Sequence, residues 1–178
     1  MSRQSIPLKN PYLAAFLAWL VPGLGHFYQG RRGKGVLYFV CILGLFVAGL
    51  TMGGGKIVFW RWVSPFQNFE DFRLWYLAQF WVGLAAFPAV IQSTLARYGM
   101  SPILGGYLAE PALHVLNGMH RQYGRFIDIG TVYTAIAGLL NVLAIYDAFE
   151  GPALADEPDP STSPEPAKPA SLVLEPST

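Results

Sequence analysis

The sequence predicts an all-α, polytopic membrane protein with four transmembrane helices, and three observations lead to that fold class. Hydrophobic residues make up 53% of the 178 residues and charged residues only 13%, against about 25% charged in a typical soluble domain. Four stretches without Asp, Glu, Lys or Arg are about as long as the roughly 20 apolar residues that cross a bilayer. None alternates apolar and polar residues as barrel strands do, so helices are expected.

The four predicted spans lie in one transmembrane domain over residues 1–150, since a chain of this length is expected to form one domain. They cover about residues 11–30, 35–53, 74–96 and 129–148. Between the third and fourth spans, Pro111 occupies a favoured first helical position. Apolar residues then recur on one face up to Tyr123, which predicts an amphipathic surface helix over about residues 111–123.

Residues 151–178 have a different composition from the rest of the chain. Seven of these 28 residues are proline, five are acidic and none is aromatic. Such a segment buries too little apolar surface to offset its chain entropy. We therefore expect a disordered, proline-rich, acidic tail, which serves either as a spacer or docking segment or has no role.

The charge and cysteine content exclude several classes of function. Twelve Lys and Arg residues balance eleven Asp and Glu residues, so the chain lacks the basic surplus of a nucleic-acid-binding protein. A single cysteine excludes an internal disulfide framework and a multi-cysteine zinc site. His114 and His120 do not share a helix face. The sequence therefore predicts no metal, no cofactor and no nucleic acid, with the lipid bilayer as the first partner.

The most distinctive motif lies between the first two predicted spans. Its proline should kink or end the first helix, and its glycines permit a tight turn. Its tyrosine and basic residues suit the headgroup region. The histidine is either a proton carrier or ligand, or a hydrogen-bonded residue beside the turn. The candidate turn and interface motif comprises Pro22, Gly23, Gly25, His26, Tyr28, Gly30, Arg31, Arg32 and Lys34.

Two parts of the chain resemble known families. The order helix, Pro-Gly-x-Gly-His-Phe-Tyr-x-Gly, basic residues and second helix over residues 9–50 resembles the two-transmembrane (DRF-motif) domain family, which implies a hairpin of two membrane helices. The stretch from Tyr123 to Ala148 is similar to an uncharacterised family of planctomycete membrane proteins. That similarity implies an inner-membrane protein with four helices and no known activity.

Small residues and one amide mark predicted helix contacts. Gly44 and Ala48 in the second span, and Gly138 in the fourth, let helix backbones approach closely. Asn141 is expected to seek a hydrogen bond across to another helix, because its amide would otherwise face hydrocarbon. We predict that these four residues pack helix against helix.

No catalytic motif is present, so the sequence favours a non-enzymatic role in the cell (inner) membrane. The leading hypothesis is an assembly or regulatory subunit that associates with other membrane proteins or with further copies of itself. One alternative is a small transporter or channel subunit whose path is lined by His26. The other is an enzyme acting on lipid headgroups, with His26 as base and Arg31, Arg32 and Lys34 holding phosphate.

Lys and Arg residues divide evenly between the two sides of a four-span arrangement. The three basic residues at positions 31–34 are clustered in a short turn, and the positive-inside rule gives most weight to such charges. This favours a cytoplasmic turn, with both termini outside; the alternative is a cytoplasmic amino terminus held by Arg3 and Lys9.

Overall fold

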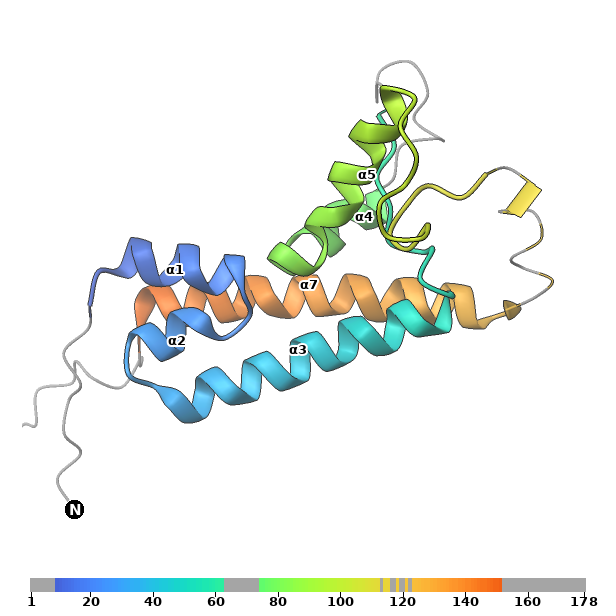
Figure 1. The fold of residues 1–178 in the computed structure, drawn as a ribbon. Coiled ribbons are helices and arrows are strands. Elements are labelled where there is room, and N and C mark those ends of the chain that lie inside the picture. Colours follow the sequence, from blue (N-terminus) through green and yellow to red (C-terminus); the bar gives the residue numbers. More distant parts are fainter. Residues whose placement is uncertain are drawn as a thin grey trace, which may run out of the picture.

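The computed structural model describes residues 9–62, 74–112, 114–115, 118, 121 and 123–151. Within these residues the regular structure is helical and contains no strand, which confirms the all-α class (Figure 1). The elements are α1 (Pro11–Leu20), α2 (Leu24–Tyr28), α3 (Arg32–Met52), α4 (Leu74–Phe80), the 3₁₀ turn η2 (Gly83–Ala85), α5 (Phe87–Arg97) and α7 (Phe126–Glu150).

Two long helices, α3 and α7, run antiparallel along each other (Figure 1). Lys34 at the start of α3 contacts Asp147 near the end of α7. Gly49 near the end of α3 meets Gly130 near the start of α7. A Cβ built on Gly49 would lie 2.7 Å from the Gly130 carbonyl oxygen, and one on Gly130 would lie 2.5 Å from the Gly49 oxygen. The two backbones therefore touch at a pair of glycines.

In the described residues, α3 and α7 are the two helices long and apolar enough to cross a bilayer. They correspond to the predicted spans 35–53 and 129–148. The other two predicted spans are not continuous helices. Residues 11–30 hold two short helices, α1 and α2, and residues 74–96 hold α4, η2 and α5.

The first break follows from Pro22 and Gly23. Proline cannot continue the hydrogen-bond ladder of α1, and Gly23 takes a φ of +83°, which reverses the chain. As a result α1 and α2 form a helical hairpin. Its open end lies beside the end of α7, where the ring of Tyr12 packs on Phe149 with centroids 5.4 Å apart. At that same end α2 finishes and α3 begins.

This reversal changes which residues lie at the same end of the bundle. In a four-span arrangement Lys9 and the turn at 31–34 lie at opposite ends of the bundle. In the structure both lie beside the end of α7, because α1 and α2 return to where α1 began.

The second break lies between α4 and α5. Gly83 has a φ of +82°, and α5 begins with a proline in its first turn. In Figure 1 this second hairpin rises steeply from the middle of α7 and leans toward the end where α3 finishes and α7 begins, whereas the first hairpin lies beside the end of α7. At the open end of the second hairpin, Tyr76 of α4 packs on Trp60 with ring centroids 5.4 Å apart, and Gln92 of α5 donates to the carbonyl of Tyr107.

The tips of the two hairpins meet near the middle of α7. A Cβ built on Gly83 would overlap the carbonyl oxygen of Trp19 and lie 2.7 Å from that of Leu20. The chain thus has two halves of the same plan, residues 11–52 and 74–150, each a short hairpin followed by a long helix. The hairpin of the second half approaches the middle of α7 from the side where α3 ends (Figure 1).

The outside of this bundle is apolar, and some of the residues inside it are polar. The long helices expose large apolar side chains, such as Val40 at 60% and Leu143 at 64%. Several polar side chains are instead buried in the interior: His26, Gln29, Gln79, Thr134 and Asn141.

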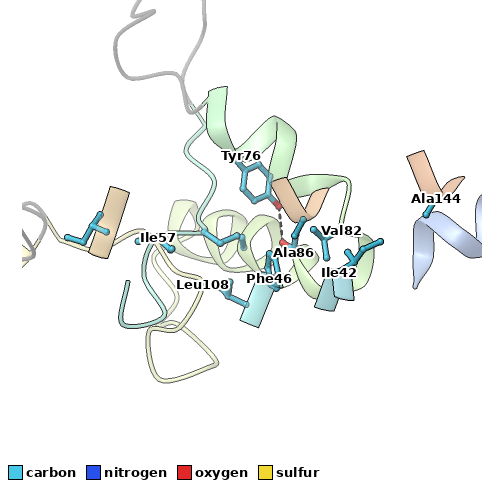
Figure 2. Packing of buried hydrophobic residues seen from close by; sticks show 12 residues of the cluster. Ile42, Phe46, Ile57, Tyr76, Val82, Ala86, Leu108 and Ala144 are labelled. Carbon is cyan, nitrogen blue, oxygen red and sulfur yellow. Dashed lines mark hydrogen bonds between the residues drawn. The ribbon is translucent and has the colours of Figure 1, made fainter. Parts of the chain in front are cut away.

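The main apolar core lies between α3, α7 and the second hairpin. Ile42 and Phe46 pack near Val82 and Ala86, and the Tyr76 hydroxyl donates to the Ala86 carbonyl at 2.9 Å (Figure 2).

Two predictions fall partly or almost wholly outside the described residues. Of the expected surface helix 111–123, residues 114, 115, 118, 121 and 123 are helical, and residues 113, 116, 117, 119, 120 and 122 lie outside the described part. Residues 152–178 of the expected tail lie outside it as well.

Candidate functional site

Asn141 joins the two hairpin tips to the middle of α7. Its Nδ2 donates to the carbonyl of Ala18 in the last turn of α1 at 3.1 Å, and to that of Trp81 just after α4 at 2.8 Å. The last carbonyls of a helix have no donor within that helix. The two N–H groups of one fully buried amide therefore satisfy one such carbonyl in each broken segment.

The same face of α7 packs directly on the backbone of α4. A Cβ built on Gly138 would overlap the Ala78 carbonyl oxygen, so only glycine fits there. Thr134, one turn earlier, accepts a hydrogen bond from Gln79 Nε2 at 2.8 Å. Residues 134, 138 and 141 share one helix face, so the second hairpin packs on this face of α7.

Two polar atoms at this meeting point have no hydrogen-bond partner among the described residues. They are Oδ1 of Asn141 and Nε1 of Trp19, one an acceptor and the other a donor. The Trp19 ring lies against Phe80 and Phe87, with centroids 5.8 and 5.6 Å away, so it bridges from the first hairpin to the second.

A second polar cluster lies at the end of α7, around Asp147. Its carboxylate accepts from His26 Nε2 at 2.8 Å, from Arg31 Nη2 at 3.1 and 3.2 Å, and from Lys34 Nζ at 3.2 Å. Arg31 also donates to the Asp147 backbone carbonyl at 3.0 Å. One carboxylate thus ties α2 and the start of α3 to α7.

His26 is fully buried within this cluster and its ring lies on Tyr38, with centroids 4.7 Å apart. Burial lowers the pKa of the imidazole, against the raising effect of its hydrogen bond to Asp147. A neutral imidazole donates from Nε2 to the carboxylate, which leaves Nδ1 as an acceptor with no partner among the described residues.

The rest of the turn motif runs along the first hairpin, from its tip at Pro22 and Gly23 to the end of α2 and the start of α3. The backbone passes close to its neighbours at Gly25, where a Cβ would overlap the Ala14 carbonyl oxygen, and at Gly23, where it would overlap that of Gly35. Tyr28 lies beneath the ammonium of Lys9, 5.1 Å from the ring centroid. The remaining members are Pro22, which is buried, Gly30, which has a φ of +81°, and Arg32, which is exposed.

The predicted packing residues divide into two groups. Gly138 and Asn141 lie at the contacts described above. Gly44 is exposed, and a Cβ on it would meet no atom of the described residues within 4 Å; Ala48 is half-buried. Gly44 lies on the face of α3 that points away from α7. The close approach of α3 to α7 is made by Gly49 instead.

Sequence reasoning missed the role of Asp147 as the shared partner of the basic turn. The available signal was a lone acidic residue at the end of an otherwise uncharged apolar stretch. Across the described ranges, no group of three or more His, Cys, Asp or Glu side chains is placed to hold a metal ion.

The fold and these contacts define an all-helical protein built on two apolar helices of membrane-crossing length, each preceded by a broken helical hairpin. The chain belongs to the family of unknown function DUF6677, whose model matches residues 13–159. No curated protein and no solved structure matches it. The matched range contains both Asn141 and Asp147 with all their partners. The resemblances to the two-transmembrane and planctomycete families stay predictions.

Proposed function

We propose that this chain is a multi-pass protein of the cell (inner) membrane, crossed by α3 and α7. At about 1.5 Å per residue, these helices of 21 and 25 residues are about 31 and 37 Å long. The hydrocarbon core is about 30 Å thick. The ten-residue α1 reaches about 15 Å. In this arrangement the two hairpins enter from opposite faces, meet near mid-depth and return.

The apolar outer surface of α3 and α7 carries this proposal. In the most apolar 18-residue stretch of α3 only 22% of residues are buried inside the chain, and in that of α7 only 39%. A core helix of a water-soluble protein would be covered by other elements. Lipid is the solvent that favours apolar side chains outside and hydrogen-bonded amides inside.

Within the membrane we propose a non-catalytic role as an assembly or regulatory subunit. The buried amides of Asn141 and Gln79 and the carboxylate of Asp147 are engaged in holding the chain to itself. The outward face of α3, with Val40 exposed and open space at Gly44, is left for a second copy or another membrane protein.

Cross-linking through Cys41 tests this association. Cys41 is the single cysteine of the chain and lies exposed on α3. Copper-phenanthroline oxidation, or a permeant bis-maleimide, applied to intact membranes should give a covalent adduct of higher mass. Gly44→Leu should reduce the yield, whereas Leu143→Ala on the outer face of α7 should not. A wild-type protein that stays monomeric under both treatments would refute association through α3.

A small transporter or channel subunit is the second candidate, and one observation favours it. Broken helices that meet near mid-depth surround the substrate sites of many secondary transporters. The meeting point at Asn141 has that form. Ion or solute flux into proteoliposomes above the level of protein-free vesicles would support this candidate, and its absence would remove it. The lipid-headgroup enzyme gains no support, since His26 is fully buried against Asp147 and Tyr38.

A further inference from the structure

His26 holds the first hairpin against the end of α7. This α2 residue is fully buried, and its Nε2 donates to the Asp147 carboxylate at 2.8 Å. On the side of α3, the Tyr38 ring lies against the imidazole, and Arg31 and Lys34 reach the same carboxylate. The imidazole therefore lies where α2, α3 and α7 meet, and a change in its protonation affects the contacts among all three.

The charged groups around a neutral His26 already sum to one positive charge. Arg31 and Lys34 share the single carboxylate of Asp147, and the Arg31 side chain is only 9% exposed. On the other side of α2, α1 packs against Gly25 and contains no charged residue. Among the described residues, a proton on His26 would therefore add a second positive charge, with no further carboxylate beside it to offset that charge.

Protonation would also leave a buried donor without an acceptor. Nδ1 of His26 is buried and has no hydrogen-bond partner among the described residues. It is an acceptor in the neutral imidazole and becomes a donor when it takes up a proton. Oε1 of Gln29, at the end of α2, is also unpartnered, so it does not reach Nδ1 in this arrangement. A buried N–H without a partner is unfavourable, and water would hydrate it once α2 left α7.

These surroundings oppose protonation of His26. Burial, the largest effect, lowers the pKa of the imidazole from its ordinary value of 6.5. The hydrogen bond to Asp147 raises the pKa, and the charges of Arg31 and Lys34 lower it. In a hairpin that has left α7, the imidazole regains its ordinary pKa and binds a proton more tightly. Acid therefore favours the hairpin that has left α7.

The link between the first hairpin and α3 leaves space for such a movement. At Gly30 the φ is +81°, and a Cβ built there would meet no atom of the described residues within 4 Å. Two other hydrogen bonds oppose the movement: Gln29 donates to the Ala148 carbonyl, and Asn141 donates to the Ala18 carbonyl. The state of His26 thus shifts a balance that these bonds also set.

We propose that His26 is a pH-sensitive switch, which docks the first hairpin on α7 while neutral and releases it when Nδ1 takes up a proton. The stabilisation of the docked hairpin is fully present above about pH 6.5, the ordinary histidine value, and is lost as the pH falls below it. This inference goes beyond the proposed association, because it concerns contacts within one chain.

Amide hydrogen exchange of the full chain in mild-detergent micelles tests this switch. Exchange is followed by mass spectrometry at about pH 7.5 and about pH 5.5, where a free imidazole is about 9% and about 90% protonated. After correction for the intrinsic pH dependence of exchange, the protection factor of α1 and α2 should fall by up to about tenfold. The protection of α4 and α5, in the second hairpin, should not change.

Two single substitutions assign the effect to His26. His26→Gln keeps an N–H group that can donate to Asp147 but removes the titration, so α1 and α2 should be equally protected at both pH values. His114→Gln, the matched control, removes an exposed histidine and should leave the wild-type pH dependence intact.

Unchanged protection of the first hairpin in the wild type, an equal fall in the second hairpin, or the same fall in His26→Gln overturns the inference. A second measurement decides the question even if His26→Gln does not fold. When His114→Gln and His120→Gln are combined, His26 is the single histidine, and nitrogen NMR of its imidazole reports its pKa directly. A pKa below 6.5 in the folded chain supports the switch, and a pKa at or above 6.5 overturns it.

Discussion

Replacing Asn141 by leucine should separate the two hairpin tips from α7. Leucine has as many non-hydrogen side-chain atoms as asparagine and the same branching, but it has no N–H group to donate. The carbonyls of Ala18 and Trp81 would then lie buried without the donor that they now share. We expect a folded but clearly destabilised bundle.

The size of the effect follows from the two hydrogen bonds lost. Interhelical side-chain hydrogen bonds in membrane proteins contribute about 0.6 kcal/mol on average and up to about 1.7 kcal/mol. Two such bonds give about 1 to 3 kcal/mol of unfolding free energy. The unpaired carbonyls push the value toward the upper end, because a buried polar group without a partner is unfavourable.

Unfolding by sodium dodecyl sulfate in mild-detergent micelles, followed by tryptophan fluorescence, measures this change. Two of the five tryptophans, Trp19 and Trp81, lie at the hairpin tips, so the signal includes this contact. Leu143→Ala is the control, since that side chain is 64% exposed and an exposed substitution changes stability by only about 0.5 kcal/mol or less. If Asn141→Leu unfolds with the wild type or with this control, the amide does not hold the tips and the reasoning is wrong.

Three other predictions test the packing, topology and charge of the bundle. Gly138→Leu should destabilise by about 1 to 3 kcal/mol through overpacking against α4, whereas Gly44→Leu should leave thermal unfolding unchanged. In a background without the native cysteine, cysteines placed at Lys9 and at Gly33 should behave alike toward an impermeant maleimide on intact cells, both labelled or both protected. Labelling of only one of them would favour four spans. Asp147→Asn should lower the thermal unfolding temperature by an amount equivalent to about 1 to 3 kcal/mol, because hydrogen bonds to charged groups are strong, and an unchanged temperature would argue against the charge cluster as a tie.

Hydropathy alone predicted the two long helices but could not separate them from the broken ones. Residues 35–53 and 11–30 are both long apolar stretches, and apolar content reports solvent preference rather than backbone continuity. Pro22 signalled the end of α1. The reversal depends on the positive φ of Gly23, which a sequence permits without requiring.

The candidate site was also predictable only in part. An amide in the fourth apolar stretch was expected to bond across helices, and Asn141 does donate across them. Its acceptors could not be predicted, because the carbonyls of Ala18 and Trp81 become free only where α1 and α4 end. Likewise, Asp147 meets the basic turn only because the first hairpin returns to its starting end.

The first hairpin also has consequences for how the chain is made. Its polar partners on α7 lie 116 to 123 residues further along the sequence. At about 5 to 20 residues per second, a ribosome needs roughly 6 to 25 s to synthesise that stretch. Throughout this interval the Ala18 carbonyl and the His26 imidazole have no α7 to receive them. The nascent hairpin therefore lacks these contacts until the last helix has been made, and only then can it close into the bundle.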